Sequence, residues 1–274
     1  MRGFVSRSLF YTCGMPPRSD PSPPPSPPSP SAPCVRTHGN RRTLAFENGD
    51  IQSEMLLSHP DALVLDYARA MMCFALFAPR PRHIVMVGLG GGSLAKFCYR
   101  HFPHTRITVL EISLEVIALR AVFEVPPDDA RLRIVHADAA DCLGAMEAAA
   151  DVILVDGFDA AGMPPALGSA AFYRDCRRAL REGGVLVANI LSYDPCHDAI
   201  AQRIDGAFGG RVCDFPGIAG NNHLLFAVRD RAGGATTRAA RLQERVARRG
   251  AWGFGFLNRL LARALVAWLA RRAV

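Results

Sequence analysis

One segment constrains this chain more than any other, the glycine-rich run VMVGLGGGS at 85–93. An apolar, strand-like run ends at Val87, glycines follow, and a helix-like stretch begins at Leu94. A second apolar run, 106–110, then leads directly to Glu111. Glycines at such a turn let the backbone approach a ligand closely, and a helix N-terminus offers unpaired N–H groups. An acid after the next strand can accept hydrogen bonds from a ribose diol, so this order of pieces predicts a nucleoside-binding α/β domain.

The residues around the loop favour a sulfonium nucleoside, S-adenosylmethionine or a relative, over NAD. Dinucleotide sites usually carry G-x-G-x-x-G/A, whereas here the third small position is Ser93 and three glycines run together. Sulfonium-nucleoside domains favour one acid after the second strand and another after the third. We therefore expect Gly88, Gly90 and Gly92 to shape the binding loop, Glu111 to bind the ribose and Asp138 to meet the adenine amino group.

Apolar runs alternate with helical stretches through the middle of the chain. Strands are expected near 83–88, 106–111, 131–136, 151–156 and 184–190. This order predicts a parallel sheet with helices on both faces and a ligand site beyond the carboxyl ends of the strands. Two later runs, 211–215 and 223–228, are joined by PGIAG, which favours an antiparallel pair at the sheet edge. The predicted fold class is thus α/β, a class I S-adenosylmethionine-dependent-transferase (Rossmann-like) parallel sheet with an antiparallel last strand.

The sequence divides into four parts. Residues 1–42 form a Pro/Ser-rich leader that we expect to be disordered, because it cannot build a core. Residues 43–66 form a small N-terminal β-hairpin part, with a turn at 48–49 and an extended piece at 62–65. The nucleoside-binding domain spans 67–230 and opens with a helix over 67–77, and 231–274 is a basic amphipathic tail.

Charge is distributed unevenly along the chain. The leader carries six Arg and one Asp, and the tail carries ten Arg and one Glu, so the formal charge of +7 leaves 43–230 net acidic. An acidic domain is a poor nucleic-acid surface and a suitable host for a cationic substrate, so we expect no nucleic-acid partner. With no apolar stretch of signal-peptide length before residue 13, and eight scattered Cys without C-x-x-C, we expect a cytoplasmic protein.

The tail leaves two interpretations open. Arg238, Arg241, Arg245 and Arg248 recur at three- and four-residue steps, as on one face of a helix. The apolar stretch 252–270 is short for a membrane span and is interrupted by two arginines. It is either a helix that docks on this protein or a partner, or a helix that lies on an anionic membrane surface.

Two acids follow the fourth predicted strand, Asp156 and Asp159. A sulfonium is already an activated electrophile, so the enzyme mainly has to deliver a nucleophile in line. A protonated amine has no lone pair, and a carboxylate can hold the ammonium and take its proton. The pair therefore fits an amine acceptor. In the alternative interpretation, Asp159 caps the next segment and Asp156 orients the backbone.

Residues 43–230, about two-thirds of the chain, resemble the polyamine aminopropyltransferase family, the spermidine and spermine synthases, and especially a bacterial spermidine-synthase-like branch. The order and spacing of the shared segments carry the resemblance. They are NGDIQS at 48–53, LDY at 65–67, the loop 88–93, Glu111, HADA at 136–139, VDGFD at 155–159, FY at 172–173 and LREGGV at 180–185.

This resemblance implies roles for individual residues and for ligands. The donor would be decarboxylated S-adenosylmethionine, the acceptor a small diamine or polyamine, and the assembly a homodimer; no metal and no tightly bound cofactor would be needed. Gln52 would contact the nucleoside side, Glu111 the ribose and Asp138 the adenine. Asp156 would activate the attacking amine, Asp159 would be a second amine-holding acid and Tyr67 would lie beside the amine.

Four sites in the sequence, of one to four residues each, depart from the family pattern, and all of them belong to the half that would bind the polyamine. Gly91 stands where synthases usually carry an Asp, Gly157-Phe158 replaces Ser-Ser, Ala68 replaces a polar residue, and GNNH at 220–223 replaces a Pro-x-Gly segment. Two rivals stay open. One is a methyltransferase that uses intact S-adenosylmethionine, since Gly91 removes repulsion against the donor's carboxylate. The other is a non-catalytic nucleoside-binding homologue.

Overall fold

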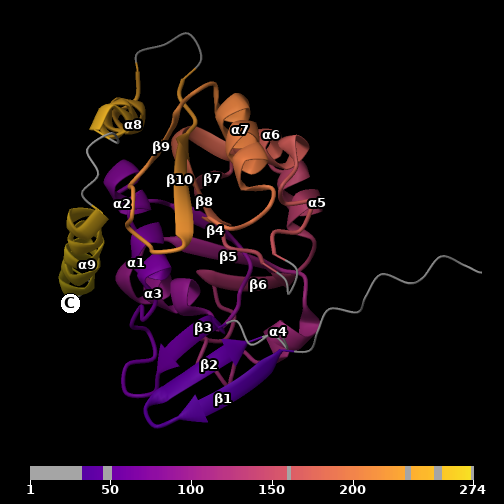
Figure 1. Ribbon diagram of the computed structural model, residues 1–274. Helices are drawn as coiled ribbons and strands as arrows, with labels where there is room; N and C mark the ends of the chain where they lie inside the picture. The colour runs from indigo at the N-terminus through magenta and orange to yellow at the C-terminus, as the bar shows by residue number, and fades with distance from the viewer. Residues whose placement is uncertain (1–32, 46–50, 159–161, 232–235, 250–254, 273–274) are drawn as a thin grey trace, which may run out of the picture.

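The computed structural model describes residues 33–45, 51–158, 162–231, 236–249 and 255–272. These residues form a small three-stranded antiparallel sheet and a larger seven-stranded sheet flanked by helices (Figure 1). The larger sheet has the strand order β6-β5-β4-β7-β8-β10-β9. The predicted fold class, α/β with a parallel sheet and an antiparallel last strand, is confirmed.

The larger sheet keeps five parallel strands side by side. They are β4 (His83–Val87), β5 (Arg106–Glu111), β6 (Leu132–His136), β7 (Ala150–Val155) and β8 (Leu180–Leu191). The last strand, β10 (Asn222–Val228), is antiparallel to both β8 and the edge strand β9 (Val212–Asp214). Because the parallel strands end at the same edge of the sheet, the residues that follow them converge there. Strand β8 begins four residues before its predicted start, since Leu180 already pairs with Ala150.

Helices cover both faces of this sheet, and alternate strand residues point to opposite sides. One core contains Ile84 and Met86 of β4 and packs against α1 (Asp66–Met71), α2 (Phe74–Phe77) and α3 (Ser93–His101). Helices α8 (Arg238–Arg249) and α9 (Gly255–Arg272) add to that core. The other core contains Val85 and Val87 and packs against three helices, α5 (Ala139–Gly144), α6 (Ala170–Ala179) and α7 (His197–Phe208). A short helix, α4 (Leu114–Ala118), follows β5.

The small sheet corrects the predicted end of the leader. Residues 34–42 were expected to be disordered, but β1 (Cys34–His38) pairs antiparallel with β2 (Arg41–Ala45). A tight turn joins them, in which Gly39 takes a positive φ of 54°. Strand β2 in turn pairs antiparallel with β3 (Ile51–Leu56), so this part is a three-stranded sheet. The expected turn at 48–49 and residues 1–32 lie outside the described residues.

The segment before β4 differs from the expectation in its helix. The piece 62–65, expected to be extended, joins no sheet and runs through a bend and irregular backbone to Leu65, whose backbone is extended, before α1. The single helix expected over 67–77 is two short helices, because Met72 and Cys73 form a turn. The N–H of Cys73 bonds the carbonyl of Ala70, and that of Ala75 bonds the carbonyl of Met72, which is the tighter three-residue spacing.

A buried lysine anchors the small sheet to the larger one. The Nζ of Lys96, on α3, donates to the carbonyl of Phe123 at 2.6 Å and contacts the Met55 sulfur of β3 at 3.0 Å. Burial lowers the pKa of Lys96 to about 8. Met55 is fully buried in the core, and the neighbouring Glu54 side chain pairs with Arg41. Strand β3 is thereby held beside the N-terminal end of α3, next to the glycine loop.

Candidate active site

A cavity of about 970 Å³ lies at the carboxyl ends of the parallel strands. The loops after β4, β5, β6, β7 and β8 line it, and the small sheet borders it through Leu44 and the start of β3. Seven of the residues predicted for the site line this one cavity: Gln52, Tyr67, Gly88, Gly90, Glu111, Asp138 and Asp156. Asp159 lies outside the described residues.

The glycine loop passes directly against the end of β7. Gly88 has a φ of 91°, and a Cβ there would lie 2.4 Å from the carbonyl oxygen of Asp156. Only glycine allows this approach, so Gly88 fixes where the backbone of Asp156 lies relative to the loop. Gly90, with a φ of 50°, lines the cavity, and a Cβ there would make only ordinary contact with Ser53, at 3.8 Å.

Gly92 has a packing role in this structure. It precedes α3 with a φ of 68°, and a Cβ there would lie 2.3 Å from the Cγ2 of Val125. Gly92 is also absent from the described lining of the cavity. The glycine requirement at this position therefore comes from the contact between the helix start and Val125.

Two carboxylates at the β5 and β6 end of the cavity are held by backbone N–H groups. Glu111 is 7% exposed, and its oxygens accept from the N–H of Leu89 at 2.7 Å and from the N–H of Ser113 at 2.8 Å. Each oxygen keeps a second lone pair for a further donor. Asp138 precedes α5 and accepts from the N–H of Ala140 at 2.7 Å, which leaves its other oxygen uncommitted to that cap.

The third carboxylate, Asp156, is oriented by side chains on neighbouring strands. The amide Nδ2 of Asn189 donates to Oδ1 of Asp156 at 2.9 Å. The Nδ2 of Asn222 donates in turn to Oδ1 of Asn189 at 3.0 Å. The three residues come from the end of β7, from β8 and from β10, which are adjacent in the sheet. We call this chain of two hydrogen bonds the asparagine relay.

The surroundings of Asp156 shift the pKa of its carboxyl group. Burial raises the pKa of Asp156 to about 6, although hydrogen bonds from Asn189 and Tyr67 oppose the shift. Burial, followed by the nearby Asp156 charge, raises the pKa of Tyr67 well above its ordinary value. The Tyr67 hydroxyl is thus a neutral donor, and it also lies 3.2 Å from the carbonyl of Gln52. A carboxylate with a pKa near neutrality suits proton transfer.

The structure gives a physical account of the glycine at position 91. A Cβ there would lie 2.7 Å from the Ser53 hydroxyl and 2.9 Å from a ring carbon of buried Phe123. A carboxylate side chain would therefore displace its neighbours. Two hydroxyls face the cavity nearby, since Ser53 and Ser93 lie 3.3 Å apart and both line it.

The cavity wall carries negative charge. Four carboxylates line it, namely Glu111, Glu115, Asp138 and Asp156, and the described lining residues include neither Lys nor Arg. Such a wall favours cationic ligands and disfavours phosphates and carboxylates. Tyr193 also lines the cavity and is 64% exposed.

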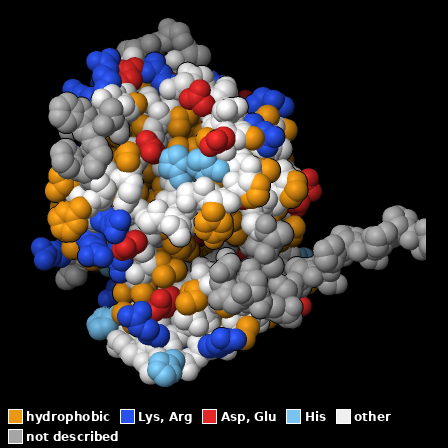
Figure 2. Space-filling model, in the orientation of Figure 1, with side chains coloured by type: hydrophobic (Ala, Val, Ile, Leu, Met, Phe, Trp, Pro, Cys, Tyr) orange, Lys and Arg blue, Asp and Glu red, His pale blue; other side chains and the backbone are white. Residues whose placement is uncertain are grey.

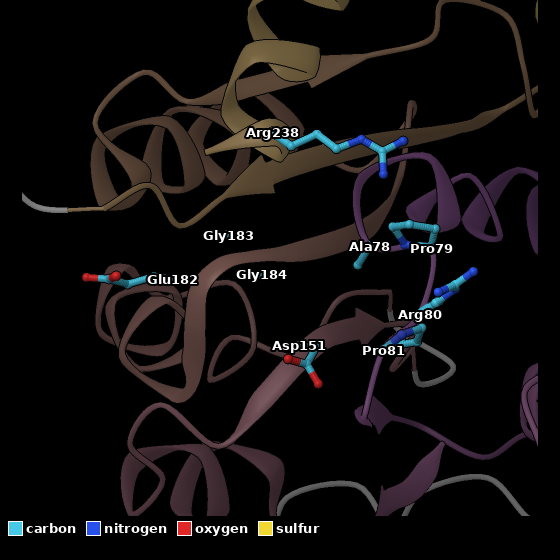
Figure 3. A pocket seen from close by; sticks show the side chains of 9 residues that line it. All are labelled: Ala78, Pro79, Arg80, Pro81, Asp151, Glu182, Gly183, Gly184 and Arg238. Carbon is cyan, nitrogen blue, oxygen red and sulfur yellow. The ribbon is translucent and has the colours of Figure 1, made fainter. Parts of the chain in front are cut away.

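A second hollow, of about 470 Å³, lies at the opposite edge of the sheet (Figure 3). Its acid, Asp151, is committed to structure, because one carboxylate oxygen accepts from the N–H groups of Arg82 and His83 at 2.7 and 3.0 Å. That oxygen also pairs with Arg181, and the other acid of this hollow, Glu182, pairs with Arg231. The bonds of Asp151 connect the starts of β4, β7 and β8, so this carboxylate has a structural role. The hollow offers no set of side chains comparable to that of the larger cavity.

The order of strands, the antiparallel β10 and the cavity at the carboxyl edge together define the class of protein. This is the fold of class I S-adenosylmethionine-type transferases, with polar side chains gathered where such domains hold their ligands.

Comparison with known proteins gives the family. The model of the spermine/spermidine synthase domain matches residues 65–202. The chain is 40% identical over 195 residues to the polyamine aminopropyltransferase of Neisseria meningitidis serogroup A, which covers 70% of this chain and 74% of that protein. The chain therefore belongs to the spermine/spermidine synthase family and is a transferase, as its sequence pattern predicted.

Solved structures agree on the fold. A probable spermidine synthase from Corynebacterium glutamicum superposes with a TM-score of 0.63 at 22% identity, covering 78% of this chain and 82% of that one. A spermidine synthase in complex with the transition-state analogue AdoDATO superposes with a TM-score of 0.52 at 24% identity, covering 72% and 74%. At these identities the likeness concerns the fold alone.

Proposed function

We propose that this protein transfers an aminopropyl group from decarboxylated S-adenosylmethionine to a small diamine. One observation supports this most, the cavity wall with four carboxylates and neither Lys nor Arg among its described residues. The donor carries a sulfonium and a primary ammonium, and the acceptor is an ammonium at neutral pH, so every charged group of both substrates is positive. Such ligands gain from this wall, whereas an intact donor would bring a carboxylate into it.

The nucleoside belongs at the β5 and β6 end in this proposal. Glu111, already fixed by two backbone N–H groups, uses its remaining lone pairs for the ribose hydroxyls. Asp138 accepts from the adenine amino group, and Gln52 borders the nucleoside from the small sheet. Gly88 and Gly90 leave room for the backbone to approach the ligand.

Asp156 is the proposed base. It accepts a hydrogen bond from the acceptor's ammonium and takes one proton, which frees the nitrogen lone pair. The nitrogen then bonds to the aminopropyl carbon attached to sulfur, the carbon–sulfur bond breaks, and its electron pair stays on sulfur. The products are a longer polyamine and neutral methylthioadenosine. The asparagine relay occupies Oδ1 of Asp156, and Tyr67 stands beside it. Asp159 stays a predicted second acid for the amine.

Methyl transfer from intact S-adenosylmethionine is the second candidate. Gly91 supports it, because no carboxylate stands at that position to repel the donor's own. The Ser53 and Ser93 hydroxyls are donors that a carboxylate could use. The acidic wall weighs against this candidate and is the reason we rank it second.

Calorimetry and turnover together test the proposal. We expect decarboxylated S-adenosylmethionine and methylthioadenosine to bind more tightly than the intact donor, and putrescine to be converted with release of methylthioadenosine. Preference for the intact donor, with S-adenosylhomocysteine as product, would establish the second candidate instead. Tight binding without turnover across a panel of diamines would leave a non-catalytic nucleoside-binding protein. We further propose a homodimer in the cytoplasm, which sedimentation and cell fractionation can check.

A further inference from the structure

Helix α9 has one face that packs on the protein. Ala262 and Leu269 are 2% and 3% exposed and belong to the core that also contains α1. Asn258, on the same face, donates from Nδ2 to the carbonyl of Pro216 at 2.9 Å. This face is sufficient to attach the helix to the domain, and a helix attached in this way normally presents polar residues outward.

The exposed side of α9, directly beside this packed face, is instead rich in large apolar side chains. Leu257, Leu261 and Trp268 follow one another at steps of four and seven residues, so they form one stripe along the helix, and they are 54%, 38% and 47% exposed. Phe256 and Leu260 lie beside the stripe with 72% and 43% exposed. Among the described residues, five of the ten exposed large hydrophobic side chains are on this one helix. Such a concentration marks an interaction surface.

Exposed arginines lie on the same side of the molecule as this apolar stripe. Arg259, Arg263 and Arg271 are exposed on α9, and four more, Arg238, Arg241, Arg245 and Arg248, are exposed on α8. Figure 1 shows both helices along the same side of the molecule, and Figure 2 shows apolar and basic side chains adjoining there. Glu244, the single acid of 231–274, pairs with Arg211, and Arg263 of α9 pairs with Asp66 of α1 at 3.5 Å. The other exposed arginines leave this side of the molecule both apolar and positive.

The charge and the apolar side chains of this surface distinguish between the partners that could bind it. A second copy of the chain would form an isologous contact and bring the same arginines against each other. Nucleic acid would pair with the arginines and leave the apolar stripe in water. An anionic lipid surface matches both features, since apolar side chains enter the acyl boundary, Trp favours the interface and Arg meets the headgroups. No helix among the described residues is long and apolar enough to cross a membrane.

We propose that α9, with the arginines of α8, docks this protein on anionic membrane surfaces as a peripheral attachment, with the exposed apolar side chains of α9, Leu257 and Leu261 foremost, inserted. The domain stays outside the bilayer, tethered by the packed face of the same helix. This inference is independent of the catalytic proposal, because lipid binding is measured without substrate.

Vesicle flotation of the full chain tests the proposal. We expect binding to vesicles of equal parts phosphatidylcholine and phosphatidylglycerol, little binding to pure phosphatidylcholine, and weaker binding as salt screens the charges. The double variant Leu257→Gln, Leu261→Gln should lose on the order of tenfold in affinity for the mixed vesicles. The variant Val122→Gln, which changes an exposed apolar residue elsewhere, is the matched control and should bind like the parent.

Three outcomes would overturn the proposal. Equal binding to both vesicle types would show that anionic lipid is not required. Undiminished binding by the double variant would show that the stripe does not contact the lipid. A parent dimer that the double variant converts to a monomer, with no lipid binding by either, would assign the stripe to a second copy of the chain. Thermal unfolding and circular dichroism of the double variant, compared with the parent, show that α9 still folds.

Discussion

The two ends of the cavity hold their carboxylates by different means. At the β5 and β6 end, Glu111 and Asp138 accept hydrogen bonds from main-chain N–H groups of the loops that follow each strand. At the β7 and β8 end, Asp156 is oriented by side chains, through Asn189 and then Asn222. A backbone-held acid is fixed by the fold itself, whereas a side-chain-held acid can be retuned by one substitution. In the proposed reaction, the backbone-held end takes the invariable nucleoside and the side-chain-held end takes an acceptor of adjustable identity.

The largest effect is expected from Asp156→Asn. The amide keeps the shape and the contact with Asn189 but cannot take a proton, so aminopropyl transfer should fall by about 10²–10⁴-fold. Steady-state turnover with putrescine measures this, and calorimetry should show methylthioadenosine bound as before. Asp128→Asn, at a carboxylate 44% exposed and paired with Arg120, is the control and should be nearly silent. Equal losses in both variants would show that Asp156 has no special role.

Glu111→Gln should affect the β5 and β6 end of the cavity and leave the Asp156 end unchanged. The neutral amide has one acceptor oxygen where the carboxylate has two, so a ribose hydroxyl would lose a hydrogen bond to a charged group. Such a bond contributes about 1.5–3 kcal/mol, so methylthioadenosine affinity should drop roughly ten- to hundredfold. The amide NH₂ would also face the N–H of Leu89 or Ser113, which lowers stability with and without ligand. Calorimetry measures the affinity. Unchanged affinity would show that Glu111 does not bind the nucleoside.

Gly88→Ala should affect both ends at once. The added Cβ would press on the carbonyl of Asp156 at 2.4 Å, in a backbone conformation that alanine resists. We expect a loss of about 1–3 kcal/mol in the free energy of unfolding, with reduced turnover. Gly206→Ala is the matched control, because that helical glycine has nothing within 4 Å of its added Cβ. It should stabilise the protein by about 1 kcal/mol in denaturant titration.

Gly91→Asp asks whether the family's usual acid can be restored. Contacts at 2.7 and 2.9 Å with Ser53 and Phe123 oppose it, so we expect a loss of about 1–3 kcal/mol in stability and no gain in affinity for the decarboxylated donor. Thermal unfolding and calorimetry measure both quantities. Tighter binding of that donor would instead show that the pocket wall yields easily at this position.

The smallest expected change is in pH dependence. With the pKa of Asp156 at about 6 and the base active when ionised, kcat/KM should fall tenfold for each pH unit below that value. The Asn189 hydrogen bond lowers this pKa, so Asn189→Ala should raise it and move the acid limb to higher pH. Measured pH profiles of kcat/KM for the parent and Asn189→Ala test this shift. An unmoved limb would mean that the relay does not tune Asp156.

Local motifs made much of the β5 and β6 end of the cavity predictable. The glycine loop, Glu111 and Asp138 lie within or directly after short apolar runs, and a parallel sheet brings such positions together whatever the details of packing. Asn222 is different, because its role depends on how β10 lies antiparallel on β8, with Leu224 opposite Asn189. Nothing in the local sequence specifies that register. The leader's end was misplaced because the prolines before residue 34 dominated the composition of a segment whose last part forms β1.

The chain contains a single lysine, and its amine is covered by Met55 and the carbonyl of Phe123. A reagent that modifies lysine side chains has therefore one side-chain target, and it can reach that target only when Met55 of β3 or the segment at Phe123 moves away from α3. The rate of covalent modification of Lys96 would thus report local opening where the small sheet packs on α3, in the native protein and without any engineered probe.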